Sequence, residues 1–224
     1  MSPRLVALTL LLAVSPFARA QPTADAIDLF AAEDFAGWTV VAATPVDLRS
    51  ICSRTPEGSL SFSGTPTGYL QTEATHENFI LRLDYRWPAD AAPKSNGGIL
   101  LHIVSGPVTP AAWPTCIQLQ TKVNNAGDLL QMFGSTFAEP VTSPAKGNVP
   151  PLRARQQEPS ERPFGEWNLV EVVCLRGTIE VRINGVLQNR VTQAEPRAGR
   201  IGIQLEGAPF ELRHVHLTPL PAGE

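Results

Sequence analysis

Hydrophobic and polar positions alternate with a period of two along most of the chain. In the run 79–87, apolar side chains occupy every second position, and charged side chains fill most of the positions between them. Because successive side chains of a β-strand point to opposite faces, this run predicts a strand with one buried face. Shorter runs predict further strands at 38–41, 59–63, 69–72, 99–104, 117–121, 129–133, 201–206 and 210–217.

A hairpin is predicted in the second half of the chain. The alternating run 167–175 continues into 178–183, and Asn184-Gly185 then leads into a further run at 186–191. Asn-Gly suits a tight turn in which both residues need a positive φ. No stretch of helical period competes with these runs. The pattern therefore predicts an all-β fold, a two-sheet antiparallel β-sandwich or jelly roll.

Residues 134–166 interrupt this regular spacing with six prolines among charged and small residues, and nothing in the segment looks like a strand. Ordered loops longer than about 12–15 residues are uncommon in compact domains and are usually functional covers or mobile segments. Both alternatives remain open for this loop.

The first twenty residues have the features of a secretory signal. Arg4 precedes an apolar run at 5–14, and Ala18-Arg19-Ala20 provides a cleavage site. We therefore expect a periplasmic or secreted protein that consists of one β-sandwich domain, 21–224, with the long loop 134–166. The apolar run is shorter than the roughly 20 residues of a membrane span, so no membrane span is expected.

Composition narrows the classes of partner. The chain has 18 basic and 21 acidic residues and a net charge of −3, without a basic stripe, so nucleic acid is not an expected partner. Cys52, Cys116 and Cys174 allow one disulfide and leave one thiol over. Cys174 is in step with Val170 and Val172, which predicts a small buried residue.

Candidate binding residues are polar side chains whose parity is opposite to that of the apolar residues on three predicted strands. They are His102, Gln118, Gln120, Gln204 and Glu206. Each could be ordinary solvated surface. However, long amide side chains both donate to and accept from sugar hydroxyls, so a shared carbohydrate site is the sharper hypothesis. It requires the three strands to be near neighbours.

Two further residues accompany this set. Asn96 precedes the strand that carries His102, and Trp113 could stack on a sugar ring. No nucleophile elbow, zinc-protease motif, paired CxxC or phosphate-binding loop is present. His214 and His216 could share one strand face, but no third metal ligand is apparent, so a structural or surface role is the simpler interpretation.

An ordered set of motifs resembles the 3-keto-disaccharide hydrolase domain family, which has a concanavalin A-like fold. The motifs are Asn96–His102, Trp113–Gln120, Asn125–Asp128, Gly165–Asn168, the Ile183-Asn-Gly-Val hairpin, Gly199–Gly207 and Leu212–Val215. The similarity extends from about residue 27 to residue 220. It implies cleavage, by hydrolysis or elimination, of glycosides already oxidised at carbon 3. Such a site needs a base, an enolate stabiliser and an acid for the leaving group, and a divalent metal ion could serve as the stabiliser.

The chain departs from the family pattern at three positions. Gln118 stands where a glutamate is usual, His102 replaces a common arginine, and Gly97 replaces a serine. Because an amide cannot act as a general base, the resemblance passes that role to Glu206 or His102. Gln118, Gln120 and Gln204 would then orient the sugar.

Asn96, Trp113 and Arg213 complete the expected substrate-binding set, with Arg213 pairing with a carboxylate. The alternatives are a non-catalytic carbohydrate-binding module and, less favoured, a sandwich that binds a protein partner.

Overall fold

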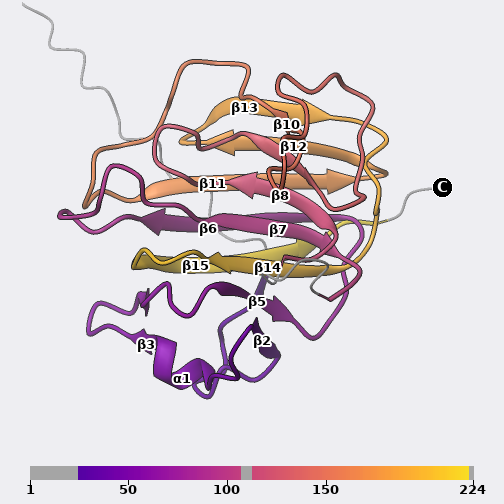
Figure 1. Cartoon of the computed structure of the whole chain (residues 1–224). Helices are drawn as coiled ribbons and strands as arrows, with labels where there is room; N and C mark the ends of the chain where they lie inside the picture. Colours follow the sequence, from indigo (N-terminus) through magenta and orange to yellow (C-terminus); the bar gives the residue numbers. More distant parts are fainter. Residues whose placement is uncertain (1–24, 107–112, 222–224) are drawn as a thin grey trace, which may run out of the picture.

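The computed structural model describes residues 25–106 and 113–221. Its strands form two antiparallel sheets that pack face to face, with β13 at the top of Figure 1 and the short helix α1 (Leu48–Ile51) at the bottom. The expected all-β sandwich is confirmed. The expected signal segment 1–20 lies outside the described residues, and no helix in the described part is long and apolar enough to cross a membrane.

The first sheet contains eight strands in the order β13-β12-β11-β6-β15-β4-β3, and β1 also pairs with β15. Their bounds are β13 Val186–Val191, β12 Thr178–Ile183, β11 Asn168–Leu175, β6 Phe79–Arg86, β15 Phe210–Pro219, β4 Leu60–Phe62, β3 Cys52–Arg54 and β1 Ile27–Asp28. The predicted hairpin at Asn184-Gly185 joins β12 to β13, and both turn residues have a positive φ.

The second sheet contains seven strands in the order β10-β9-β8-β7-β14-β5-β2. Their bounds are β10 Leu152–Arg153, β9 Leu129–Met132, β8 Cys116–Gln120, β7 Gly98–Ile103, β14 Arg200–Leu205, β5 Gly68–Thr72 and β2 Trp38–Ala42. Strand β7 is hydrogen-bonded to both β8 and β14. The three strands that carry the candidate site residues are therefore adjacent, as the site hypothesis requires.

The main core lies between the two sheets. It includes ten apolar residues at alternate positions of β6, β7, β8 and β14, as the period of two predicts: Phe79, Leu81, Leu83, Ile99, Leu101, Ile117, Leu119, Ile201, Ile203 and Leu205. A smaller apolar cluster covers the opposite face of the second sheet, called here the outer face. It contains Tyr69, Leu100, Ile103, Cys116, Leu130 and Met132. The central strands β7 and β8 of the second sheet are thus buried on both faces, whereas alternation alone predicts one polar, solvated face.

The proline-rich segment 134–166 is tied to the sandwich by hydrogen bonds. It contributes β10, which pairs with β9, so the expectation that it contains no strand is wrong. The Ser160 hydroxyl donates to the Ile183 carbonyl at 2.8 Å, and the side-chain NH2 of Asn184 donates to the Ser160 carbonyl at 2.7 Å. These contacts favour a fixed wall over a mobile loop.

The three cysteines are all buried and unpaired. Cys174 has the predicted small apolar role, with 1% of its surface exposed. Burial raises the pKa of the Cys52 thiol to about 12 and also raises the pKa values of the Cys116 and Cys174 thiols. All three therefore stay protonated and unreactive near neutral pH.

Candidate functional site

Three glutamine side chains meet on the outer face of the second sheet. Gln118 and Gln120 come from β8, and Gln204 comes from β14. The Gln118 amide nitrogen donates to Gln120 Oε1 at 2.6 Å and to Gln204 Oε1 at 2.8 Å. All three side chains are buried, so these bonds satisfy polar groups that would otherwise be costly to remove from water.

Gly98 of β7 makes this arrangement possible, because β7 lies between the two strands that carry the glutamines. A Cβ atom at Gly98 would lie 2.7 Å from Gln118 Nε2 and 2.9 Å from Gln204 Oε1. It would also lie 2.9 Å from the backbone oxygen of Leu119. The missing side chain therefore leaves the space in which the amides meet.

Glu206 follows β14 and joins the same network. Its Oε2 atom accepts a hydrogen bond from Gln204 Nε2 at 2.7 Å and another from Asn96 Nδ2 at 2.6 Å. Burial raises the pKa of the Glu206 carboxyl, and the positive charge of Lys122 opposes that shift. A half-buried carboxylate with a raised pKa is suited to accept and return a proton near neutral pH. This network of five residues, Asn96, Gln118, Gln120, Gln204 and Glu206, is called here the amide cluster.

His102 does not join the amide cluster, so the expectation that it shares this face is wrong. The pairing of β7 with β14 shifts by one residue between Arg200 and Gly202, and His102 has a φ of 57°. Such a bulge reverses the alternation of side chains beyond it. The ring instead contacts Phe79 at 5.5 Å, and its two nitrogens face the Glu77 and Pro196 carbonyls, each at 3.1 Å.

The same bulge moves Ile103 to the outer-face apolar cluster, where Trp113 and Phe133 pack against it. Trp113 therefore lies on the same sheet face as the amide cluster, as expected for a substrate-binding residue.

Arg213 lies on β15 of the first sheet, not beside the amide cluster. Its guanidinium pairs with Asp84 at 2.8 Å and lies over the Trp167 ring at 4.2 Å from the ring centre. It pairs with a carboxylate as expected, but this pair belongs to a strand of the opposite sheet. His214 also bonds to Asp84, at 3.0 Å. These contacts link the residues of that sheet to one another.

Tyr69 was not among the residues singled out by sequence reasoning. It lies directly across from Gln204 in the pairing of β5 with β14. Its side chain is fully buried, and its hydroxyl finds no hydrogen-bond partner among the described residues. Burial raises its pKa to about 12, so the phenol keeps its proton at neutral pH and can act as a hydrogen-bond donor. Its parity is the only sequence signal, and an ordinary packing tyrosine shares that parity.

The residues around Glu206 do not fit a divalent cation. Asn96 and Gln204 both turn their amide NH2 groups, not their oxygens, toward the carboxylate. Over residues 25–106 and 113–221, no three His, Cys, Asp or Glu side chains are grouped so that they could hold a metal ion. We therefore assign no metal ligand in the amide cluster.

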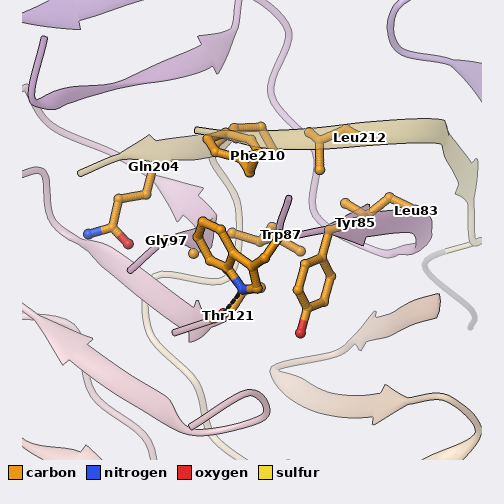
Figure 2. Close-up of a pocket in the computed structure, with 11 residues that line it drawn as sticks. Leu83, Tyr85, Trp87, Gly97, Thr121, Gln204, Phe210 and Leu212 are labelled. Carbon is orange, nitrogen blue, oxygen red and sulfur yellow. Dashed lines mark hydrogen bonds between the residues drawn. The ribbon is translucent and has the colours of Figure 1, made fainter. Parts of the chain in front are cut away.

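A small cavity lies on the other side of Gly98, between the two sheets. It has a volume of about 20 Å³, and Figure 2 shows Trp87 among its lining residues with the Gln204 amide directed away from the rings. The Trp87 indole nitrogen donates to the Thr121 carbonyl at 3.2 Å. This volume has room for roughly one water molecule, so this cavity is too small to hold a sugar.

The sequence matches one family model. A model described as the 3-keto-alpha-glucoside-1,2-lyase-like domain matches residues 25–218. The resemblance found from the motifs is thereby confirmed. A comparison with curated proteins finds no match.

Three solved structures illustrate the fold. A candidate glycosyl hydrolase from Parabacteroides distasonis is 18% identical, with a TM-score of 0.60 over 88% of this chain and 94% of its own. A β-glucanase from Bacillus licheniformis is 11% identical, with a TM-score of 0.53 over 88% and 97%. A carbohydrate-binding module from Bacillus subtilis is 10% identical, with a TM-score of 0.52 over 81% and 95%. At these identities the likeness is one of fold.

Proposed function

The chain belongs to the 3-keto-alpha-glucoside-1,2-lyase-like domain family, and from this premise we propose that it cleaves the glycosidic bond of 3-keto-glycosides. The amide cluster on the outer face of the second sheet is the proposed site. The observation that carries the proposal is the half-buried Glu206 carboxylate, which is held by two amide donors beside three linked glutamines.

The chemistry begins with removal of a proton. A ketone at carbon 3 acidifies the hydrogen on carbon 2, and Glu206 takes that proton while the electron pair forms an enolate. The enolate then collapses to a double bond between carbons 1 and 2, and the aglycone leaves carbon 1 with a proton from water or a donor. Addition of water across that double bond would complete a hydrolysis. A carboxylate whose pKa is raised toward neutral pH suits the first step.

The neutral amides have a different role in this proposal. Asn96 and Gln204 fix the orientation of Glu206, because both donate to the same oxygen and leave its second oxygen for the substrate. Gln118 and Gln120 provide further polar groups for sugar hydroxyls. His102 is not assigned as a base, because both ring nitrogens face backbone carbonyls away from the amide cluster.

A non-catalytic carbohydrate-binding module is the second candidate function. Gln118 favours it, because a neutral amide stands where the family pattern has a carboxylate. The side-chain NH2 of Gln118 already donates to two neighbouring glutamines, as expected for a residue that positions other side chains and takes no part in chemistry.

Replacement of Glu206 by glutamine separates the two candidates. The oxygen of the new amide can keep both donors, so sugar binding should change by less than about tenfold, which equals about 1.4 kcal/mol. Release of nitrophenol from a nitrophenyl 3-keto-glucoside should stop. Glu57→Gln, at an exposed turn, is the matched control and should leave release unchanged. An unmodified protein that binds the glycoside in calorimetry but never releases nitrophenol would support the binding module.

We also propose that the protein is exported and that residues 1–20 are removed. The arrangement of Arg4, the apolar run 5–14 and Ala18-Arg19-Ala20 supports this. N-terminal sequencing of the protein from cell fractions should find Gln21 first in the periplasmic or secreted fraction. An intact Met1 in that fraction would contradict the proposal.

A further inference from the structure

A second and larger pocket opens at one end of the sandwich, outside the amide cluster. It has a volume of about 490 Å³. The loop after β6, the turn between β8 and β9, the segment 159–164 and the start of β11 form its walls. A volume of this size is within the range of small-molecule sites, roughly 300–1,000 Å³.

Hydrogen bonds at three points fix the walls. The Gly165 amide donates to the Trp87 carbonyl at 2.8 Å, and the Arg162 amide donates to Asn168 Oδ1 at 2.8 Å. The Tyr85 hydroxyl donates to Glu161 Oε1 at 3.0 Å. A pocket that is already formed spends little binding free energy on ordering its own loops.

Most of the lining is apolar and rigid. Trp87, Phe164 and Val123 contribute apolar side chains, and prolines at 93, 159 and 163 add flat, stiff ring faces. Such walls suit a ligand with a compact ring.

The two charged groups of the lining differ in how far they are satisfied. The Glu161 carboxylate is bonded by Tyr85 and by the backbone amides of Asn124 and Ala126, and Arg155 lies close enough to act on its charge. The exposed Arg162 guanidinium has only a long contact, 3.4 Å, to the Trp167 carbonyl. Within the described ranges, no carboxylate lies at ion-pair distance from Arg162. The pocket therefore presents one cation that is free to bind an anion.

We propose that this pocket is a second binding site, separate from the amide cluster, for a small cyclic carboxylate. The ring packs against Phe164 and the prolines, and the carboxylate accepts hydrogen bonds from the Arg162 guanidinium. Arginine suits this role because its planar fork matches the two oxygens of a carboxylate.

Benzoate is the probe. Benzyl alcohol, which has the ring without the charge, and acetate, which has the charge without the ring, are the controls. Calorimetry should find benzoate binding at least tenfold tighter than either control, and the Val123 methyl signals should shift in NMR spectra on its addition. Equal binding of benzoate and benzyl alcohol, or the absence of a shift at Val123, would overturn the proposal.

Variants test the contribution of the cation and the separation of the sites. Arg162→Gln should weaken benzoate about tenfold and leave benzyl alcohol unchanged, whereas Arg162→Lys should keep part of the affinity. Arg197→Gln, at another exposed arginine, is the matched control and should change nothing. Glu206→Gln should leave benzoate binding intact. Loss of benzoate binding in that variant would place the ligand at the amide cluster and refute a separate site.

Discussion

Gly98→Ala is the sharpest test of the amide cluster, because the substitution adds one methyl group where three glutamines meet. The new Cβ would lie 2.7 Å from Gln118 Nε2, 2.9 Å from Gln204 Oε1 and 2.9 Å from the Leu119 backbone oxygen. The two amide ends can swing aside. The Leu119 oxygen belongs to β8 and cannot move without disturbing the pairing of that strand.

The expected cost follows from two effects. An extra methyl group in a tightly packed region costs about 1–3 kcal/mol. Separation of the glutamines breaks two buried hydrogen bonds, each with a net contribution of about 0.5–1.5 kcal/mol. The loss of backbone freedom in the unfolded chain works in the opposite direction by about 0.4–1 kcal/mol. The free energy of unfolding should therefore fall by about 1–6 kcal/mol.

Urea unfolding followed by tryptophan fluorescence measures this change. Gly106→Ala is the control, because among residues 25–106 and 113–221, its chain neighbours aside, no atom lies within 4 Å of a Cβ at that position, and its φ is not in the left-handed region. It should leave the free energy of unfolding within about 1 kcal/mol of the unmodified protein. The geometry of the cluster is refuted if the two variants unfold at the same urea concentration. Sugar binding should also weaken in Gly98→Ala and stay unchanged in Gly106→Ala.

Two further predictions concern charge in the amide cluster. Because burial raises the pKa of Glu206, its folded form holds a proton at a pH where the unfolded chain has lost it, so this group stabilises the protein at acid pH. That contribution should disappear as the pH rises through the folded pKa. In a plot of kcat against pH, turnover should decrease on the acid side at the pKa of folded Glu206, because the protonated carboxyl cannot act as the base. A decrease at the unperturbed pKa of a glutamate would argue against Glu206 as the base. Gln118→Glu replaces an amide that donates to Gln120 and Gln204 by a buried acceptor, so urea unfolding should show a loss of stability at pH 7 that lessens at acid pH. Equal stability at both pH values would show that the new carboxyl is solvated.

The alternation of apolar and polar residues along the chain predicted much of the fold. The β-strand Phe79–Arg86 and the hairpin at Asn184-Gly185 lie where period and turn chemistry predict them. Both signals are local, because the direction of a side chain follows from its place in the strand and a tight turn requires particular residues. The short strand β10 was missed, since two residues inside a proline-rich loop have no period to detect.

Only the tertiary structure shows that the residues of the amide cluster meet. Four of them, Gln118, Gln120, Gln204 and Glu206, were singled out by their parity. Parity says which face a side chain lies on, but only the order β8-β7-β14 decides that these strands are neighbours. The same limit explains the two misplaced residues. His102 was turned away by a bulge that forms only when β7 pairs with β14, and Arg213 belongs to the opposite sheet.

The sequence by itself determined most of the strand-forming segments, ten residues of the main core and the family. The tertiary structure alone decided which polar groups meet, where the alternation breaks, and that the loop 134–166 walls a pocket. The physical reason is that periodicity depends on bonds along the chain, whereas strand order, bulges and cavities depend on contacts between segments far apart in sequence. Gly98 illustrates the difference. The sequence shows a glycine in a strand, but only the structure shows that a side chain there would collide with Gln118 and Gln204 from the two neighbouring strands.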